Sequence, residues 1–283
     1  MTNITSPIIS PEDLVALTQN EKIILIDASF GKNNYLNQHL KRALHVDLNT
    51  ELSDIKEDFA DGGRHPLPSA GQFCSLLSNL GISPDSHVVV YDDKNGSNAA
   101  SRFWWMMKAI GHQKIQVLDG GLAAAIKAGF AASNGEEPKP IPSNYTVKDW
   151  TMAMADIAEV EKVSRNKEYL VIDVRETERY NGAKEPIDLI AGHIPGAVNI
   201  PFSLNLDQDG FFKSPEELKK MYINFIKDSP TKNIIIHCGS GVTACHTLLA
   251  MAYAGLDLPN LYVGSWSEWS RNNKPIVTEI GES

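Results

Sequence analysis

The residues that could do chemistry are concentrated in one short segment, residues 237–243, which read His-Cys-Gly-Ser-Gly-Val-Thr. The strand-like run Asn-Ile-Ile-Ile precedes the segment at 233–236, and a helix-like run follows at 244–254. A junction of this kind points backbone N–H groups and the positive end of a helix dipole at one spot, where they stabilise a thiolate. Cys238 is therefore predicted to be a nucleophile, the alternative being a buried core cysteine beside a tight turn.

The same segment should form a cradle for an anion. Gly239 and Gly241 permit positive φ angles and leave the mouth of the loop free of side chains. The backbone N–H groups of Gly239, Ser240, Gly241, Val242 and Thr243 are the predicted donors to a bound anion.

Cysteine phosphatases also place a His-Cys pair before a phosphate-binding loop. They require an arginine six positions after the cysteine to hold the transferring phosphoryl group. Ala244 occupies that position, which argues against a phosphatase.

The composition is that of a globular protein with an acidic surface. The chain has 283 residues, of which 42% are hydrophobic and 22% charged, and its net charge is −9. This charge argues against nucleic-acid or anionic-membrane partners, and no apolar run approaches the roughly 20 residues that span a bilayer. The three cysteines, Cys74, Cys238 and Cys245, show no metal-ligand spacing, so we expect no metal site, and their low number favours the cytoplasm.

The chain repeats itself weakly at a long period. Asp27, within Ile-Leu-Ile-Asp-Ala, and Asp173, within Leu-Val-Ile-Asp-Val, lie 146 positions apart. Asp92 and Cys238 follow two similar apolar runs and are also 146 positions apart. A period of this length predicts duplicated domains, with a carboxylate in the first where the second has the thiol.

The repeat and the linker composition give the domain boundaries. Residues 133–143 are rich in proline, glycine and charge, which indicates a surface linker. We predict a non-catalytic domain over 1–135, a linker over 136–148 and a catalytic domain over 149–283. In the second copy, strands are expected near 169–174, 197–200, 232–237 and 260–263, and helices near 156–165, 215–228 and 243–255. Each copy should be an α/β domain whose parallel sheet carries the site at the carboxyl ends of its strands.

Together these features resemble the rhodanese superfamily, specifically its two-domain sulfurtransferases. Residues 192–202 (Gly-His-Ile-Pro-Gly-Ala-Val-Asn-Ile-Pro-Phe) match one signature of that family, and residues 264–269 (Gly-Ser-Trp-Ser-Glu-Trp) match another. The resemblance implies two tandem rhodanese-like domains, each with a central, mostly parallel sheet flanked by helices.

The cysteine loop distinguishes two branches of that family. Cys-Gly-Ser-Gly-Val-Thr resembles the 3-mercaptopyruvate sulfurtransferases, whereas thiosulfate sulfurtransferases carry a basic pair where this chain has Gly239 and Ser240. The resemblance implies catalytic roles for Cys238, Ser240 and His65, with Arg179 as a clamp for the substrate carboxylate.

Two positions depart from the branch. A second substrate arginine would fall at Ile187, which leaves the donor preference open. The acid that supports the histidine in some members would fall near Asn49, where Asp47 is the candidate.

The reaction that the resemblance implies is sulfur transfer through a persulfide on Cys238, with release of pyruvate and with no cofactor. The partners would be a small anionic sulfur donor and an acceptor, either cyanide or a thiol of a small molecule or a thioredoxin-like protein. Two alternatives remain open at this stage: a thiosulfate sulfurtransferase, and a non-catalytic module that carries persulfide between partners.

Overall fold

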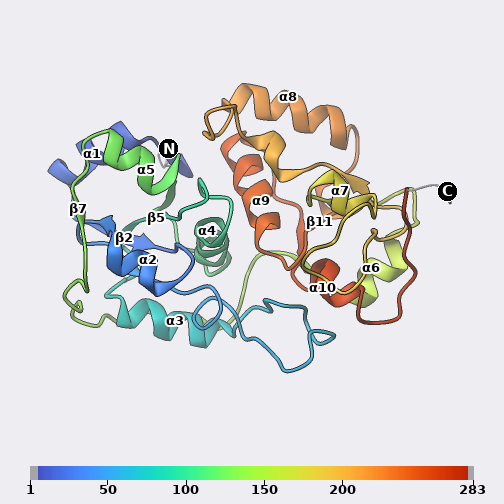
Figure 1. Cartoon of the computed structure of the whole chain (residues 1–283), viewed down its shortest axis with the longest axis horizontal. Helices are drawn as coiled ribbons and strands as arrows, with labels where there is room; N and C mark the ends of the chain where they lie inside the picture. Colours follow the sequence, from blue (N-terminus) through green and yellow to red (C-terminus); the bar gives the residue numbers. More distant parts are fainter. Residues whose placement is uncertain (1–5, 280–283) are drawn as a thin grey trace. The chain divides into compact units, whose positions relative to one another are not determined.

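The protein consists of two compact units, seen in a computed structural model that describes residues 6–279 (Figure 1). Unit 1 comprises the residues up to Asp54, Pro68–Met152 and Gln208–Phe212. Unit 2 comprises Ile55–Leu67, Ala153–Asp207 and the residues from Lys213 onward. Each unit therefore contains one short segment from the other half of the sequence.

Unit 1 is built on a five-stranded parallel sheet with the strand order β1-β6-β5-β2-β4. These strands are β1 (Ile8–Ile9), β2 (Ile23–Asp27), β4 (Leu44–His45), β5 (His87–Tyr91) and β6 (Ile115–Leu118). An antiparallel pair is formed by β3 (His39–Leu40) and β7 (Ala132–Ser133). The helices are α1 (Pro11–Asn20), α2 (Lys32–Asn37), α3 (Ala70–Asn79), α4 (Ala99–Ala109) and α5 (Gly121–Lys127).

Unit 2 contains a second five-stranded parallel sheet, with the order β10-β9-β11-β12-β8. Its strands are β8 (Met154–Ala155), β9 (Leu170–Asp173), β10 (Val198–Asn199), β11 (Ile234–His237) and β12 (Asn260–Tyr262). The helices are α6 (Ile157–Val163), α7 (Thr177–Tyr180), η1 (Phe202–Asn205), α8 (Pro215–Ile226), η2 (Thr231–Asn233), α9 (Thr243–Tyr253) and α10 (Ser265–Trp269).

The two sheets share one topology, which confirms the predicted fold class. Read from the opposite edge, the unit 2 order is β8-β12-β11-β9-β10, and it matches the unit 1 order strand for strand. Asp27 lies in register with Tyr91, as Asp173 does with His237, so Asp92 and Cys238 both follow the central strand of their sheets. Every strand and helix that the sequence predicts in the second repeat is present, with ends that differ by at most two residues.

Local signals explain where these elements begin. Ser214 caps α8 through a capping box with Glu217, and Pro215 occupies the first turn. All four residues of β11 are buried, as expected for a central strand of a parallel sheet that is covered on both faces.

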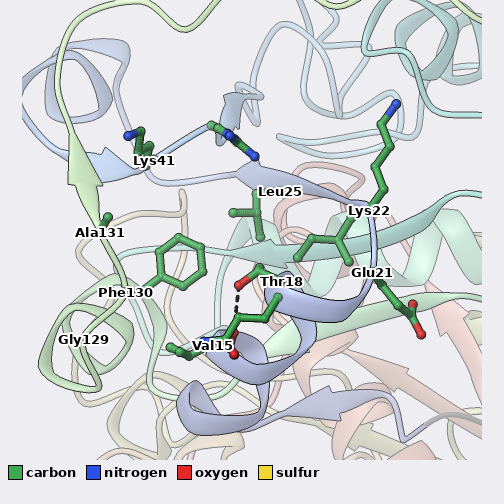
Figure 2. Close-up of a pocket in the computed structure, with 12 residues that line it drawn as sticks. Val15, Thr18, Glu21, Lys22, Leu25, Lys41, Gly129, Phe130 and Ala131 are labelled. Carbon is green, nitrogen blue, oxygen red and sulfur yellow. Dashed lines mark hydrogen bonds between the residues drawn. The ribbon is translucent and has the colours of Figure 1, made fainter.

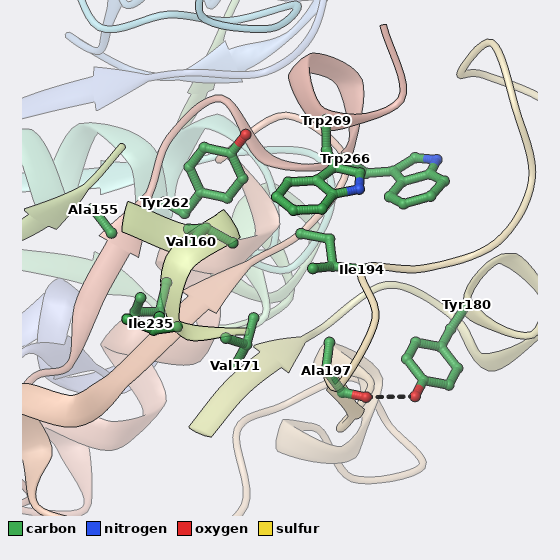
Figure 3. Close-up of a cluster of buried hydrophobic side chains, with 11 residues drawn as sticks. Ala155, Val160, Val171, Tyr180, Ile194, Ala197, Ile235, Tyr262, Trp266 and Trp269 are labelled. Atoms are coloured by element: carbon green, nitrogen blue, oxygen red, sulfur yellow. Dashed lines mark hydrogen bonds between the residues drawn. The ribbon is translucent and has the colours of Figure 1, made fainter. Parts of the chain in front are cut away.

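The core of unit 2 contains two large aromatic residues from α10 (Figure 3). Trp266 and Trp269 are both buried, and their indole N–H groups donate to the carbonyls of Ile190 and Pro275. Since both indoles are buried and hydrogen-bonded, these tryptophans serve the packing of the unit 2 core.

The two short segments that join the opposite unit occupy equivalent places in the duplication. Residues 208–212 of unit 1 lie 146 positions after residues 62–66, which belong to unit 2. In unit 1, the Phe212 N–H donates to Asp119 Oδ1, just beyond the end of β6. In unit 2, Gly63 (φ +81°) lies against the Gly264 carbonyl, just beyond β12, so closely that no side chain would fit. Each sheet therefore receives a segment from the other repeat at its carboxyl edge.

Candidate active site

Cys238 lies where the sequence predicts, between the end of β11 and the start of α9. Its residue surface is only 1% exposed. Within the described part of the chain, the backbone N–H groups of Gly239, Ser240 and Val242 donate no hydrogen bond. These N–H groups and the N-terminus of the eleven-residue helix α9, which begins at Thr243, lie where the sequence predicts a cradle for an anion. That they bind an anion stays a prediction.

The first turn of α10 fixes the cysteine loop. The Cys238 N–H donates to Ser265 Oγ at 3.2 Å, and the Cys238 carbonyl accepts from the Trp266 N–H at 3.0 Å. The Gly239 carbonyl accepts from the Ser267 N–H at 2.8 Å. The Gly-Ser-Trp motif is recognisable in the sequence as a family signature, but its residue types do not indicate that it holds the cysteine loop.

Gly241 is required by the loop conformation. Its φ is +73°, and a methyl group added there would lie 2.5 Å from the Val263 carbonyl oxygen. Any side chain at this position would push the loop away from the end of β12. Gly241 therefore allows the loop to pack directly against the backbone of Val263.

His65 and Ser240 meet at the loop. His65 Nδ1 lies 2.8 Å from Ser240 Oγ, and both residues belong to unit 2 because the segment 55–67 is part of it. By sequence position alone, His65 falls in the first repeat. The distance permits proton exchange between the imidazole and the hydroxyl.

Arg179 and Arg64 both lie over the residue that follows the cysteine. A methyl group on Gly239 would lie 3.1 Å from Arg64 Nη2, 3.4 Å from Arg179 Nη2 and 3.5 Å from Arg179 Nη1. Arg179 was predicted as an anion clamp, and its place beside the loop suits that role. Arg64 was overlooked because a lone arginine in a loop of the other repeat gives no sequence signal.

Buried carboxylates hold these guanidinium groups. Glu185 accepts from Arg179 Nε at 3.1 Å and from Arg179 Nη2 at 2.8 Å, and it also pairs with Arg175 at 3.3 Å. Burial alone would raise the pKa of Glu185, but the Arg179 guanidinium and the N–H groups of Asp188 and Ile187 together hold it below its ordinary value. Glu185 is therefore a charged anchor that fixes the direction of Arg179.

Four further residues that the sequence singled out are Ile187, Cys245, Cys74 and Asp47. Ile187 is 54% exposed, at the position where a second arginine was expected. Cys245 is buried within α9, and Cys74 is buried in α3. Asp47 lies in unit 1, where its Oδ1 accepts from the N–H groups of Asn49 and Thr50. Its support of His65 stays a prediction.

In unit 1, the loop equivalent to the cradle holds the carboxyl group of Asp92. Asp92 is fully buried, and its Oδ1 accepts from the N–H groups of Lys94 and Gly96, both at 2.8 Å. Its Oδ2 accepts from the N–H groups of Asn98 and Ala100, both at 3.1 Å. Burial raises the pKa of the Asp92 carboxyl, and the four N–H donors oppose that rise. The side chain thus occupies the anion position that the second repeat leaves open.

A separate pocket of about 340 Å³ lies in unit 1, beside α1 and β2 (Figure 2). Val15, Leu25 and Phe130 contribute its apolar wall, and Lys41 lies at its edge. None of the predicted site residues lines it. Across residues 6–279, no cluster of three or more His, Cys, Asp or Glu side chains could hold a metal ion, and no helix is long and apolar enough to cross a membrane.

Comparison with known proteins supports this description. The family model for the rhodanese-like domain matches residues 10–128 and 156–272. A probable 3-mercaptopyruvate sulfurtransferase of Pseudomonas aeruginosa is 38% identical, over 95% of this chain and 94% of its own. A thiosulfate sulfurtransferase of Mus musculus is 39% identical, over 87% and 82%.

Among solved structures, SseA from Escherichia coli, a 3-mercaptopyruvate sulfotransferase, superposes with a TM-score of 0.75 and 29% identity, covering 93% of this chain and 100% of its own. The two family matches correspond to the two repeats, and the relatives span nearly the full length. The chain belongs to the rhodanese superfamily and carries two rhodanese-like domains.

Proposed function

We propose that this protein is a 3-mercaptopyruvate sulfurtransferase. The observation that carries the proposal is the 2.8 Å pair of His65 Nδ1 and Ser240 Oγ at the head of the cysteine loop. A donor that is itself a thiol brings a proton that must move during transfer, and this pair can move it. Thiosulfate brings no such proton. The names of the relatives alone do not separate the two donors, because both activities occur among them.

The first step forms a persulfide on Cys238. The thiolate attacks the sulfur of 3-mercaptopyruvate, a sulfur–sulfur bond forms and the carbon–sulfur bond breaks. The electron pair of the broken bond leaves on pyruvate as its enolate, which takes up the proton that the donor thiol gave to the Ser240–His65 pair. The N–H groups of Gly239, Ser240 and Val242 stabilise the thiolate and the persulfide anion.

The second step returns the enzyme to its starting state. An acceptor thiolate or cyanide attacks the outer persulfide sulfur, and Cys238 leaves as a thiolate. No cofactor enters the balance of either step. We place the reaction in the cytoplasm because Cys74, Cys238 and Cys245 form no disulfide within residues 6–279, as in a reducing compartment that also supplies thiol acceptors.

We further propose that catalysis belongs to the second domain, predicted over 149–283, and that the first, over 1–135, supplies no nucleophile. The Asp92 carboxylate fills the loop that would otherwise bind an anion. A carboxylate cannot accept the donor sulfur as a thiolate does, so the first domain cannot run the same reaction.

The direct test is the donor assay with intact mass. Treatment with 3-mercaptopyruvate should add one sulfur, about 32 Da, and release one pyruvate per protein before acceptor is added. With cyanide as acceptor, kcat/KM should favour 3-mercaptopyruvate over thiosulfate by at least about tenfold. Equal or better turnover of thiosulfate would make the protein a thiosulfate sulfurtransferase, and persulfide uptake from a partner without pyruvate release would make it a carrier.

The proton pair gives a second prediction. Ser240→Ala should lower kcat for 3-mercaptopyruvate by about 100-fold, the contribution expected of a positioned acid–base group. The same change should affect turnover of thiosulfate far less, because that donor carries no thiol proton. Ser203→Ala, at an exposed serine of unit 2, is the control. Equal losses with both donors would show that Ser240 only shapes the loop.

A further inference from the structure

The pocket beside α1 and β2 of unit 1 has an apolar wall and cationic residues around it. Its volume is about 340 Å³, in the range of pockets that hold small organic molecules. Leu25 is buried, and the half-buried Phe130 ring points toward it (Figure 2). Lys22, Lys41 and Arg42 line the same pocket. A ligand in this pocket would therefore meet apolar and cationic groups together.

The protein itself does not neutralise these three cations. Within residues 6–279, the side chains of Lys22, Lys41 and Arg42 form no ion pair and no hydrogen bond. Glu21 also lines the pocket, but its Oε2 lies 3.0 Å from Nδ1 of His87, which is not among the lining residues. The whole chain carries a net charge of −9. Three unpaired cations around one pocket of an acidic protein favour the binding of an anion there.

The equivalent turn of the other repeat packs directly against its helix. Ala43 in unit 1 corresponds to Ala197 in unit 2, because the carbonyl of each accepts a hydrogen bond from a tyrosine hydroxyl of α2 or α7. Arg42 therefore corresponds to Gly196, whose φ is +86°. A side chain at Gly196 would collide with the Ser164 carbonyl at the end of α6, so this turn leaves no space there. In unit 1, residues of the equivalent turn and of α1 line the pocket instead.

Arg42 adopts the backbone conformation of that glycine although it carries a long side chain. Its φ is +72°, a value at which glycine is unstrained and a residue with a Cβ is strained. The Arg42 N–H donates to Glu137 Oε1 at 2.8 Å, which helps to hold the turn. The Lys41 N–H donates to the Ala131 carbonyl at 2.8 Å. Unit 1 therefore holds a cation beside the pocket at a cost in backbone strain, which is typical of functional positions.

We propose that this pocket binds a small organic anion, a carboxylate or sulfonate with an aromatic body. The apolar body lies against Leu25 and Phe130, and the acid group pairs with Lys41 and Arg42. All the residues that line the pocket belong to unit 1, whereas the cysteine loop belongs to unit 2. The inference therefore goes beyond the proposed function and does not depend on which sulfur donor the protein uses.

The test is a fluorescence titration of the full chain with anilinonaphthalene sulfonate, an aromatic sulfonate whose emission rises in apolar surroundings. The unmodified protein should bind the dye saturably. Arg42→Gly removes a cation and suits the positive φ, so the variant should stay folded and bind the dye at least about tenfold more weakly. Lys41→Gln should weaken binding about threefold. Lys127→Gln, at an exposed lysine of unit 1 that does not line the pocket, is the matched control and should leave the affinity unchanged.

A pair of competitors of matched size tests the preference for an anion. Phenylpropionate should displace the dye, and phenylpropanol, which has the same apolar body and no charge, should need at least about a tenfold higher concentration. Equal displacement by the two compounds would show an apolar pocket without anion preference and would overturn the proposal. Absence of saturable dye binding, or equal affinity in the Arg42→Gly and unmodified proteins, would overturn it as well.

Discussion

Replacing Cys238 by serine should abolish sulfur transfer, with a loss of about 10⁴-fold or more in kcat. The hydroxyl is a far weaker nucleophile than a thiolate and cannot carry the outer sulfur as a persulfide. The fold should persist, because the residue is buried in a loop that is held by backbone hydrogen bonds, and the serine keeps those bonds. Cyanide-dependent turnover and the absence of the added sulfur in the intact mass measure the loss.

Cys245→Ser and Cys74→Ser are the matched controls for this prediction. Both thiols are buried, on α9 and on α3, and neither lies at the head of the cradle. Each variant should retain sulfur transfer and still gain one sulfur from the donor. Substantial turnover by Cys238→Ser, or loss of the added sulfur in a folded Cys245→Ser protein, would contradict the assignment of the nucleophile.

Replacing Asp92 by alanine should be among the most destabilising single changes in unit 1. The carboxylate accepts four backbone N–H groups in a buried loop, and alanine would leave all four without their partner. Each buried N–H without a partner costs about 1–3 kcal/mol, and water that enters the vacated space offsets part of the total. We expect the free energy of unfolding to fall by about 3–5 kcal/mol, measured by urea denaturation.

Asp93→Ala is the control, since the neighbouring carboxylate is exposed and its loss should change stability by no more than about 0.5 kcal/mol. Asp92→Asn keeps one acceptor oxygen and should be intermediate between alanine and the unmodified protein. Alanine variants that remain folded should still transfer sulfur, because Asp92 carries no part of the reaction. Equal stability of the Asp92→Ala and Asp93→Ala proteins would show that the loop does not depend on the Asp92 carboxyl group.

The sequence by itself determined the duplication, the parallel sheets and the place of Cys238 at the end of a central strand. Apolar runs with a long period locate β2, β5, β9 and β11, and a strand–loop–helix junction places Cys238 at its end. These features are local, so they can be predicted from residue types and spacing. The same holds for the cap of α8 at Ser214.

Tertiary structure alone decided which distant residues complete the site. The segment 55–67 belongs to the unit of the second repeat, and this brings Arg64 and His65 to a loop some 175 positions away. The hydrophobic pattern of the sequence does not predict this exchange of segments between the two units, because it depends on how a loop packs against residues far away in the chain. The pairing of Asp188 with Arg64 and Arg179 could not be predicted from the sequence either, since a buried ion pair depends on the three-dimensional arrangement and not on spacing along the chain.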